Sequence, residues 1–192
     1  MVKPILQFTN PILNKPSVKV KDFKSQELKA LIQDLVDTAD ENRPITAGLA
    51  APQIGVSLRV CVCRRVDLEK DNEEAVPKNK LWEVMVNPEI VKENKIQSTF
   101  WEGCLSVGVG DDSLFGPVDR PNEITVKYQD KNGNPKTMNV SGFFAHEVQH
   151  EKDHLEGIIF LRYVSNPTNL WKRGVLDKYF DENGDYPPVE PS

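Results

Sequence analysis

Residues 145–157, AHEVQHEKDHLEG, contain the pattern H-E-x-x-H twice, in overlapping frames. One frame joins His146 to His150, the other joins His150 to His154, and the chain has no other histidine. Residues four apart on an α-helix lie one turn apart, about 6 Å along the axis, so two imidazoles can converge on one ion only if this segment is helical. His146 and His154 are two turns apart and cannot share an ion. The pattern therefore predicts a helix with one of two competing metal sites.

The residues around the motif bear on the choice of frame. Leu155, Gly157 and an apolar run follow the second frame directly, as expected where the end of a helix enters a core. Asp153 precedes His154, and a carboxylate can orient a metal-binding imidazole. Two histidines still need a third ligand, and no histidine follows them in the chain. The alternative interpretation is a charged, solvated helix face that binds nothing.

Cys104 is the candidate for the missing ligand. It lies in WEGCLSVG, whose glycines and serine predict an exposed loop rather than a core strand. A lone cysteine is more often a small buried residue, so simple packing is the alternative. Cys61 and Cys63 share one face of an expected strand and are interpreted as core residues. One cysteine with two histidines suits Zn²⁺ or Fe²⁺.

Composition limits the class of protein. The 192 residues are 39% hydrophobic and 28% charged with a net charge of −5, which predicts one globular domain over residues 1–192. The acidic balance argues against a nucleic-acid-binding surface. No apolar run reaches the roughly 20 residues of a membrane helix, and the first residues resemble neither a signal peptide nor a transit peptide. An odd number of cysteines favours a reducing compartment, so a cytoplasmic protein is expected.

The periodicity of apolar residues predicts both helices and strands. A helix is expected after Ser25, its N-cap, with an apolar stripe from Leu28 to Ala39. Asn132-Gly133 predicts the turn of a hairpin within 122–140. The other expected elements are strands at 58–66, 83–91 and 158–164, loops at 46–56 and 69–80, and helices at 142–156 and 169–180. Together they predict an α+β fold, a single antiparallel, strand-rich domain around a central helix that carries the H-E-x-x-H motif.

Three short blocks make the sequence similar to a known family. They are GLAAPQIG at 48–55, EGCLS at 102–106 and QHEKDHLEG at 149–157. In this order they resemble the motifs of peptide deformylases, and weaker similarity extends over nearly the whole chain. The resemblance selects the second frame, since His150, Glu151 and His154 match the family's metal motif and His146 does not. It implies a hydrolase that removes the N-formyl group from the terminal methionine of newly made polypeptides and releases formate.

The resemblance also implies a metal site and a general base. Cys104, His150 and His154 would hold one divalent ion, with water as the fourth ligand. Fe²⁺ is implied for the working enzyme, and Zn²⁺, Ni²⁺ and Co²⁺ suit the same ligands. Glu151 would take a proton from that water and deliver it to the leaving amine.

Further roles follow from the same resemblance. Gln53 and the backbone N–H of Leu105 would donate hydrogen bonds to the oxyanion. Glu102 and Arg120 stand where the family has a buried carboxylate and its arginine partner, which would support the metal loop. The residues implied in substrate binding are Gly48, Leu49, Phe143, His146 and Glu147.

Three features depart from the family's pattern. Thr46 stands where a glycine is usual, and the segment 107–117 is longer and richer in glycine. Glu147 stands where the methionine pocket usually has an apolar residue, and a buried, unpaired carboxylate is costly. Glu147 therefore turns outward, pairs with a neighbour such as His146, or marks a changed preference for the first residue.

These departures leave alternatives to the deformylase interpretation. One is a deformylase-like amidase with an altered N-terminal residue preference. Another is an H-E-x-x-H metallopeptidase, which the lack of a downstream third ligand disfavours. A third is an inactive binding module, although structural zinc sites have four protein ligands and only three candidates are found here. The expected partners are N-formyl-methionyl peptides and nascent chains near the ribosome. The expected state is a monomer with no membrane association and no nucleic-acid site.

Overall fold

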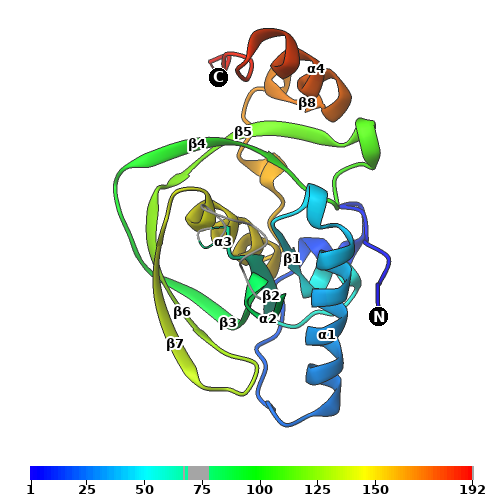
Figure 1. Ribbon diagram of the computed structural model, residues 1–192, viewed down its shortest axis with the longest axis vertical. Coiled ribbons are helices and arrows are strands. Elements are labelled where there is room, and N and C mark those ends of the chain that lie inside the picture. Colours follow the sequence, from blue (N-terminus) through cyan, green and yellow to red (C-terminus); the bar gives the residue numbers. More distant parts are fainter. Residues whose placement is uncertain (67, 69–77, 192) are drawn as a thin grey trace.

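The computed structural model describes residues 1–66, 68 and 78–191, which form a mixed fold of helices and antiparallel sheets (Figure 1). The helices are α1 (Gln26–Glu41), α2 (Lys78–Leu81), α3 (Gly142–Leu155) and α4 (Arg173–Asn183). The strands are β1 (Gly48–Ala50), β2 (Val60–Arg64), β3 (Trp82–Glu93), β4 (Gln97–Gly103), β5 (Leu114–Pro121), β6 (Glu123–Gln129), β7 (Pro135–Ser141) and β8 (Trp171–Lys172). The predicted α+β class is confirmed, and strands surround α3, which carries the H-E-x-x-H motif (Figure 1).

Two antiparallel sheets form the framework. The larger has the strand order β1-β2-β3-β6-β7, and the smaller has the order β4-β5-β8. β6 and β7 form a hairpin that closes after the pair Gln129↔Pro135, and Gly133 in its turn has a φ of +87°. Glycine adopts positive φ without steric cost, so the predicted hairpin is confirmed at its turn. β4 and β5 form a second hairpin, and β4 ends at Gly103, directly before Cys104.

Helix α3 is buried because apolar residues recur along it at helical spacing. Phe144, Val148 and Leu155 pack in one cluster with side chains of β2, β3, β6 and β7. The other faces of α3 are not left to solvent, since it also contacts β1 and β5. His150 and His154 are therefore buried with the helix, at 7% and 1% exposure. The polar motif is enclosed by protein on a rigid element.

Helix α1 forms as its periodicity predicts. The Ser25 hydroxyl accepts a hydrogen bond from the Leu28 N–H at 3.1 Å, an N-cap typically worth about 1 kcal/mol. Leu28 and Leu35 are buried against Leu49 of β1 and Val60 of β2. Strand β1 thus contacts α1 on one side and α3, the motif helix, on the other.

The predicted loop at 46–56 and the predicted strand at 158–164 are wrong. Within the first, Gly48–Ala50 pair with β2 and lie buried between α1 and α3, where Gly48 leaves room for Glu147 and Glu151 of α3. Within the second, Phe160–Arg162 form a 3-10 turn. Gly157, with a φ of +73°, ends α3 against the backbone around Lys15, and the tight turn that follows places Phe160 in the core.

Two further predictions differ from the structure. Cys104 is not in an exposed loop: it is 8% exposed, and Val107 and Phe160 pack in the same cluster. The loop predicted at 69–80 lies mainly outside the described residues, which resume at Lys78 in α2.

The predicted terminal helix forms, but it begins later than residue 169. Pro167–Asn169 form a 3-10 turn and Trp171–Lys172 pair with β5, so α4 begins at Arg173. It ends at Asn183, before Gly184 in the left-handed conformation that commonly ends helices. In the described ranges no helix combines the length and the apolar character that crossing a membrane requires.

Candidate active site

Cys104, His150 and His154 meet beside a pocket that Cys104 and His150 line. Each offers one ligand atom, and the three atoms lie within 4.8 Å of one another. Cys104 follows β4, while the two histidines are one turn apart on α3 with their ring centroids 5.0 Å apart. The Cys104 Sγ lies 3.2 Å from the His154 Nε2. One sulfur and two imidazole nitrogens in this space can hold a divalent metal ion.

The electrostatics of Cys104 favour the thiolate. Burial alone would raise the pKa of the thiol, but the charge of His154 and hydrogen bonds from His150 and His154 lower it to about 5. The backbone N–H of Ser106 also donates to the sulfur, at 3.4 Å. A thiolate is the form of cysteine that binds metals, so this side chain fits the role of a ligand.

Glu102 orients His150. A Glu102 oxygen lies 2.8 Å from the His150 Nδ1, which leaves the Nε2 to face the cysteine. Arg120 holds the same carboxylate with two hydrogen bonds, at 2.6 and 3.1 Å. Burial alone would lower the pKa of His150, but the charges and hydrogen bonds of Glu102 and Cys104 together raise that pKa well above its usual range. A carboxylate behind a ligating histidine fixes the ring and strengthens it as a ligand.

Asp153 does not orient His154, although the sequence placed a carboxylate beside it. Asp153 accepts hydrogen bonds from Arg120 at 2.6 Å and from the Tyr163 hydroxyl at 3.0 Å. Arg120 thus bridges two buried carboxylates, those of Glu102 and Asp153. Tyr163 was missed by sequence reasoning because nothing near it in the chain marks it.

The Gln53 amide is held in one orientation. Its Oε1 accepts from the Ala50 N–H at 2.8 Å, which forces the Nε2 toward Cys104 and Ser106, at 3.5 and 3.2 Å. A backbone N–H can only donate, so the opposite amide orientation would place two donors together. Leu105 also lines the pocket, and its N–H has no hydrogen-bond partner among the residues with described positions. Both groups can donate to an oxygen in the pocket.

Glu151 and Glu147, one turn apart on α3, both face Gly48 of β1. A Cβ at Gly48 would lie 2.6 Å from the Glu151 Cγ and 2.7 Å from a Glu147 oxygen, so only glycine fits there. Burial raises the pKa of Glu151 well above its usual range; His150 opposes this rise and Glu147 adds to it. The Glu151 Oε2 is buried without a hydrogen-bond partner in the described part of the chain. Buried polar atoms are rarely unpaired, so this oxygen fits a ligand or water as its partner.

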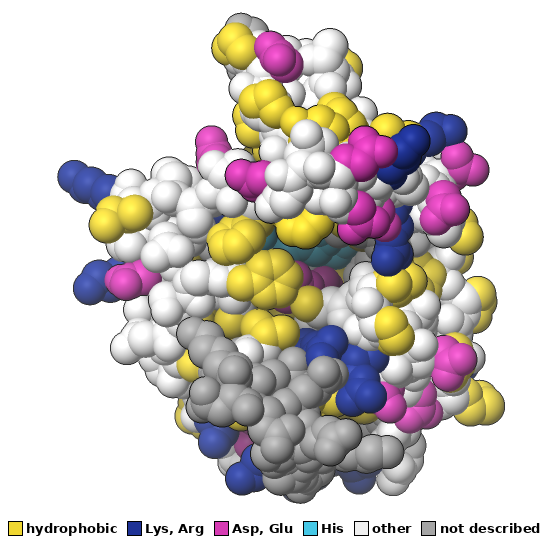
Figure 2. Space-filling view, turned by 45° about the horizontal axis from the view of Figure 1, so that its top comes forward, with side chains coloured by type: hydrophobic (Ala, Val, Ile, Leu, Met, Phe, Trp, Pro, Cys, Tyr) yellow, Lys and Arg dark blue, Asp and Glu magenta, His cyan; other side chains and the backbone are white. Residues whose placement is uncertain are grey.

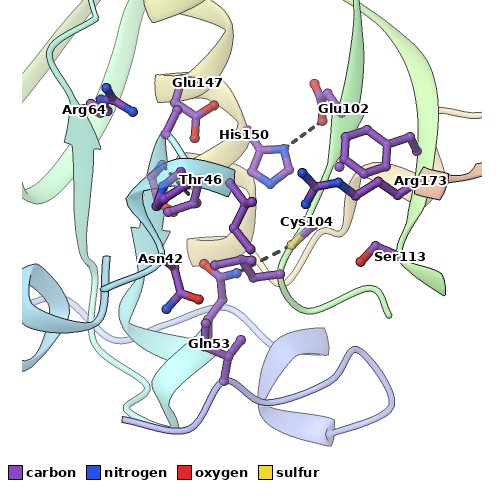
Figure 3. A pocket seen from close by; sticks show the side chains of 18 of the residues that line it. Asn42, Thr46, Gln53, Arg64, Glu102, Cys104, Ser113, Glu147, His150 and Arg173 are labelled. Carbon is purple, nitrogen blue, oxygen red and sulfur yellow. Dashed lines mark hydrogen bonds and ion pairs between the residues drawn. The ribbon is translucent and has the colours of Figure 1, made fainter. Parts of the chain in front are cut away.

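Glu147 does not turn outward, and no hydrogen bond to His146 is seen between these two described side chains. It lines the pocket and is half-buried. Burial raises its pKa; His150 opposes the shift and Glu102 adds to it. Arg64 of β2 lines the same side of the pocket (Figure 3). The pocket next to Glu151 is thus more polar than a purely apolar methionine site.

His146 stands outside the metal group. Its Nε2 lies 2.5 Å from a Glu102 oxygen, and its ring packs on Phe100 with the centroids 4.8 Å apart. The side chain is 3% exposed. The fold therefore brings the residues of the second frame together with Cys104 and directs His146 to the carboxylate behind them.

The pocket has a volume of about 660 Å³. Figure 2 shows a hollow with histidine visible inside and hydrophobic side chains around its mouth. Of the residues predicted to bind substrate, Leu49 alone is absent from the lining, because its side chain is fully buried in the core. The glycine-rich segment after Ser106 does border the pocket. Sequence reasoning missed other lining residues, which no motif marks; among them are Arg64, Phe100, Arg173 and Asp177.

Comparisons with known proteins agree with this geometry. The family described as polypeptide deformylase matches residues 2–169. A peptide deformylase of Desulfotalea psychrophila is 40% identical over 172 residues, which cover 89% of this chain and 93% of the relative. The crystal structure of a peptide deformylase from Legionella pneumophila has a TM-score of 0.73 at 34% identity and covers 97% of this chain and 100% of its own. A class I type b peptide deformylase from Acinetobacter baumannii, solved with Met-Ala-Ser bound, has a TM-score of 0.71 at 32% identity and covers 84% and 99%.

Proposed function

Since the chain belongs to the polypeptide deformylase family, we propose how its own residues divide the work of that reaction. The protein is a metal-dependent hydrolase that removes the N-formyl group from newly made peptides. The products are formate and a free amino terminus. The observation that carries the proposal is the convergence of Cys104, His150 and His154 beside a pocket that Cys104, His150, Glu151 and Gln53 line.

Cys104, His150 and His154 are the proposed metal ligands. A divalent ion held by them supplies a Lewis acid for the formyl carbonyl and lowers the pKa of a water molecule. The low pKa of Cys104 and the carboxylate behind His150 support these assignments. Fe²⁺ is the proposed working ion, and Zn²⁺, Ni²⁺ and Co²⁺ suit the same ligand set.

Glu151 is the proposed general base and acid. Its buried Oε2 lacks a protein partner in the described ranges, and burial raises its pKa, which strengthens the carboxylate as a proton acceptor. Gly48 allows this side chain to approach β1 closely. The carboxyl group would take a proton from the attacking water and deliver it to the amine that leaves.

Gln53 and the N–H of Leu105 are the proposed oxyanion donors. The Gln53 amide is pre-oriented by Ala50 and the core around it, so it needs no reorganisation when negative charge develops on the formyl oxygen. The role of Glu102 and Arg120 is to hold His150 in place through the contacts described above.

The substrate seat is proposed to include Gly48, Phe143, His146 and Glu147, all of which line the pocket. Leu49 can contribute only backbone groups, because its side chain is buried in the core. β1 lies at the edge of the larger sheet, so the substrate can pair with it in an extended conformation. The bound Met-Ala-Ser of the Acinetobacter baumannii enzyme supports the same kind of ligand here.

Formate release from formyl-Met-Ala-Ser, with protein prepared anaerobically with Fe²⁺, tests the proposal. We expect release that depends on Glu151 and on the bound ion. Cleavage of unformylated peptides at the same site would favour the H-E-x-x-H metallopeptidase instead. Metal binding without any turnover would favour the inactive binding module.

An altered preference for the first residue is the second candidate, and the position of Glu147 in the pocket favours it. A formyl-peptide with a polar first residue distinguishes the two candidates. Faster turnover of that peptide than of the methionine peptide, reversed in Glu147→Leu, would support the altered preference. Faster turnover of the methionine peptide would exclude it.

We also propose that residues 1–192 act as one catalytic domain and that the protein works as a monomer in the cytoplasm, on nascent chains near the ribosome. Gel filtration and co-sedimentation with translating ribosomes test these points.

A further inference from the structure

One wall of the active-site pocket comes from a part of the chain beyond the family match. The match ends at residue 169, whereas α4 begins at Arg173. Arg173 and Asp177, on successive turns of α4, both line the pocket that contains Cys104 and Glu151. In Figure 3 the Arg173 side chain extends from its helix over the pocket, on the side opposite Asn42 and Thr46. Helix α4 is thus part of the substrate cleft.

The start of α4 is anchored to the pocket rim. The Arg173 N–H donates to the Ser113 carbonyl at 2.8 Å, and β8, directly before it, pairs with β5. Lys172 forms an ion pair with Asp112 at 2.7 Å, although both are largely exposed. These contacts tie the first turn of α4 to the segment that follows Cys104.

Residues after α4 anchor its far side. Tyr186 stacks on Trp101 of β4, with ring centroids 5.7 Å apart. Asn169 and Glu190 exchange two hydrogen bonds, each of 2.9 Å. The helix is therefore clamped at both ends, and the position of Arg173 over the pocket is set by structure on each side.

The Arg173 guanidinium has donors to spare. Its one polar contact with a described side chain joins its Nε to Asp177 at 3.3 Å. A guanidinium carries five N–H donors in a planar fork, so both terminal nitrogens can bind an oxygen acceptor. The side chain is 32% exposed, which leaves it accessible from the pocket.

We propose that Arg173 binds the substrate through a main-chain carbonyl of the second or third residue. The formyl group would lie at the base of the pocket, and an extended peptide rises about 3.3 Å per residue, so later residues pass the rim. Asp177 pairs with Arg173, Asp111 lies next to the following residue, Gly174, and both would repel a substrate carboxylate. A main-chain carbonyl has no charge and is present whatever the sequence. An enzyme that acts on many different nascent chains can therefore use it. This inference rests on the proposed function.

Peptide length provides the test, with formyl-methionine compared with C-terminally amidated formyl-Met-Ala-Ser. For the tripeptide we expect Arg173→Gln to raise KM about tenfold with kcat unchanged, the low end of the range for hydrogen bonds to charged groups. For formyl-methionine, which has no later residues, KM should not change. Arg173→Lys should fall between, since it keeps the charge without the fork. Lys178→Gln, on an exposed part of α4, should match the wild type.

Three results would overturn the inference. Equal KM values for wild type and Arg173→Gln on the tripeptide would show that Arg173 does not contact the substrate. Equal losses on both substrates would mean that Arg173 acts on the fold or the formyl site. A loss that grows when aspartate replaces the alanine would assign the contact to a side-chain carboxylate. Absence of formate release by the wild type would instead refute the proposed function.

Discussion

Gly48→Ala tests whether the close approach of β1 to α3 positions Glu151, the proposed general base. The added Cβ would lie 2.6 Å from the Glu151 Cγ, whereas ordinary contact begins at 3.4 Å. The obstacle is the buried carboxylate of Glu151, which follows the proposed metal ligand His150 directly, and a Glu147 oxygen 2.7 Å from the added Cβ leaves it little room to move. Glu151 must therefore shift by most of an ångström.

A shift of about 1 Å in a reacting group costs on the order of 10²-fold in rate. We expect Gly48→Ala to lower kcat for formyl-Met-Ala-Ser about 100-fold. The metal content, measured by atomic emission, should stay at the wild-type level, because the three atoms nearest to the new methyl group belong to Glu151 and Glu147 and not to a proposed metal ligand.

Gly174→Ala is the matched control. Its Cβ would first meet the side chain of Asp111 at 3.1 Å, away from the metal group, and kcat should be unchanged. A wild-type kcat in Gly48→Ala would refute this prediction, since it would show that turnover does not depend on the present position of Glu151. A parallel loss of metal would show that the methyl group disturbs the ligands rather than the base.

The remaining predictions concern the metal group and its support. Glu151→Ala should keep its metal and lose about 10² to 10⁴-fold in kcat, while Cys104→Ala should lose both metal and activity; metal analysis beside formate release separates the two. His146→Ala should retain metal, and loss of the ion would mean that the wrong frame was chosen. Burial alone would raise the pKa of Glu102, but its histidine and arginine neighbours hold it well below the usual range, so its contribution to stability is present above pH ~4.3 and is lost as the pH falls. Glu102→Gln should lower the free energy of unfolding by about 3 kcal/mol at pH 7 and weaken its dependence on pH between 5 and 3, as measured by urea titration.

Local sequence was sufficient to predict those elements whose formation depends on neighbouring residues. The helix after Ser25 and the hairpin around Gly133 form as predicted, because a cap and a turn depend on neighbouring residues. The helical spacing of the motif likewise predicted how His150 and His154 align on α3. These are short-range constraints, and the sequence states them directly.

Long-range packing decided what the sequence did not show. It buries Cys104, and it sets the secondary structure of residues 48–50 and 158–164. Gly48 and its neighbours look like a loop, but they form a strand that packs between two helices, and Gly48 leaves the room that Glu147 and Glu151 of α3 need. Phe160 lies in an apolar run that suggests a strand, but the turn at Gly157 directs it into the core.

The sequence by itself determined which residues could carry the chemistry: the motif, the cysteine and the three blocks. It left two frames open until the resemblance chose one, and it could not say where Glu147 points. Only the tertiary structure decided that His146 faces Glu102, that Glu147 faces the pocket and that Arg173 forms its opposite rim. The physical reason is that side-chain direction across elements depends on how helices and strands pack, and residues such as Arg173 and Cys104 become neighbours of one pocket only when distant segments fold together.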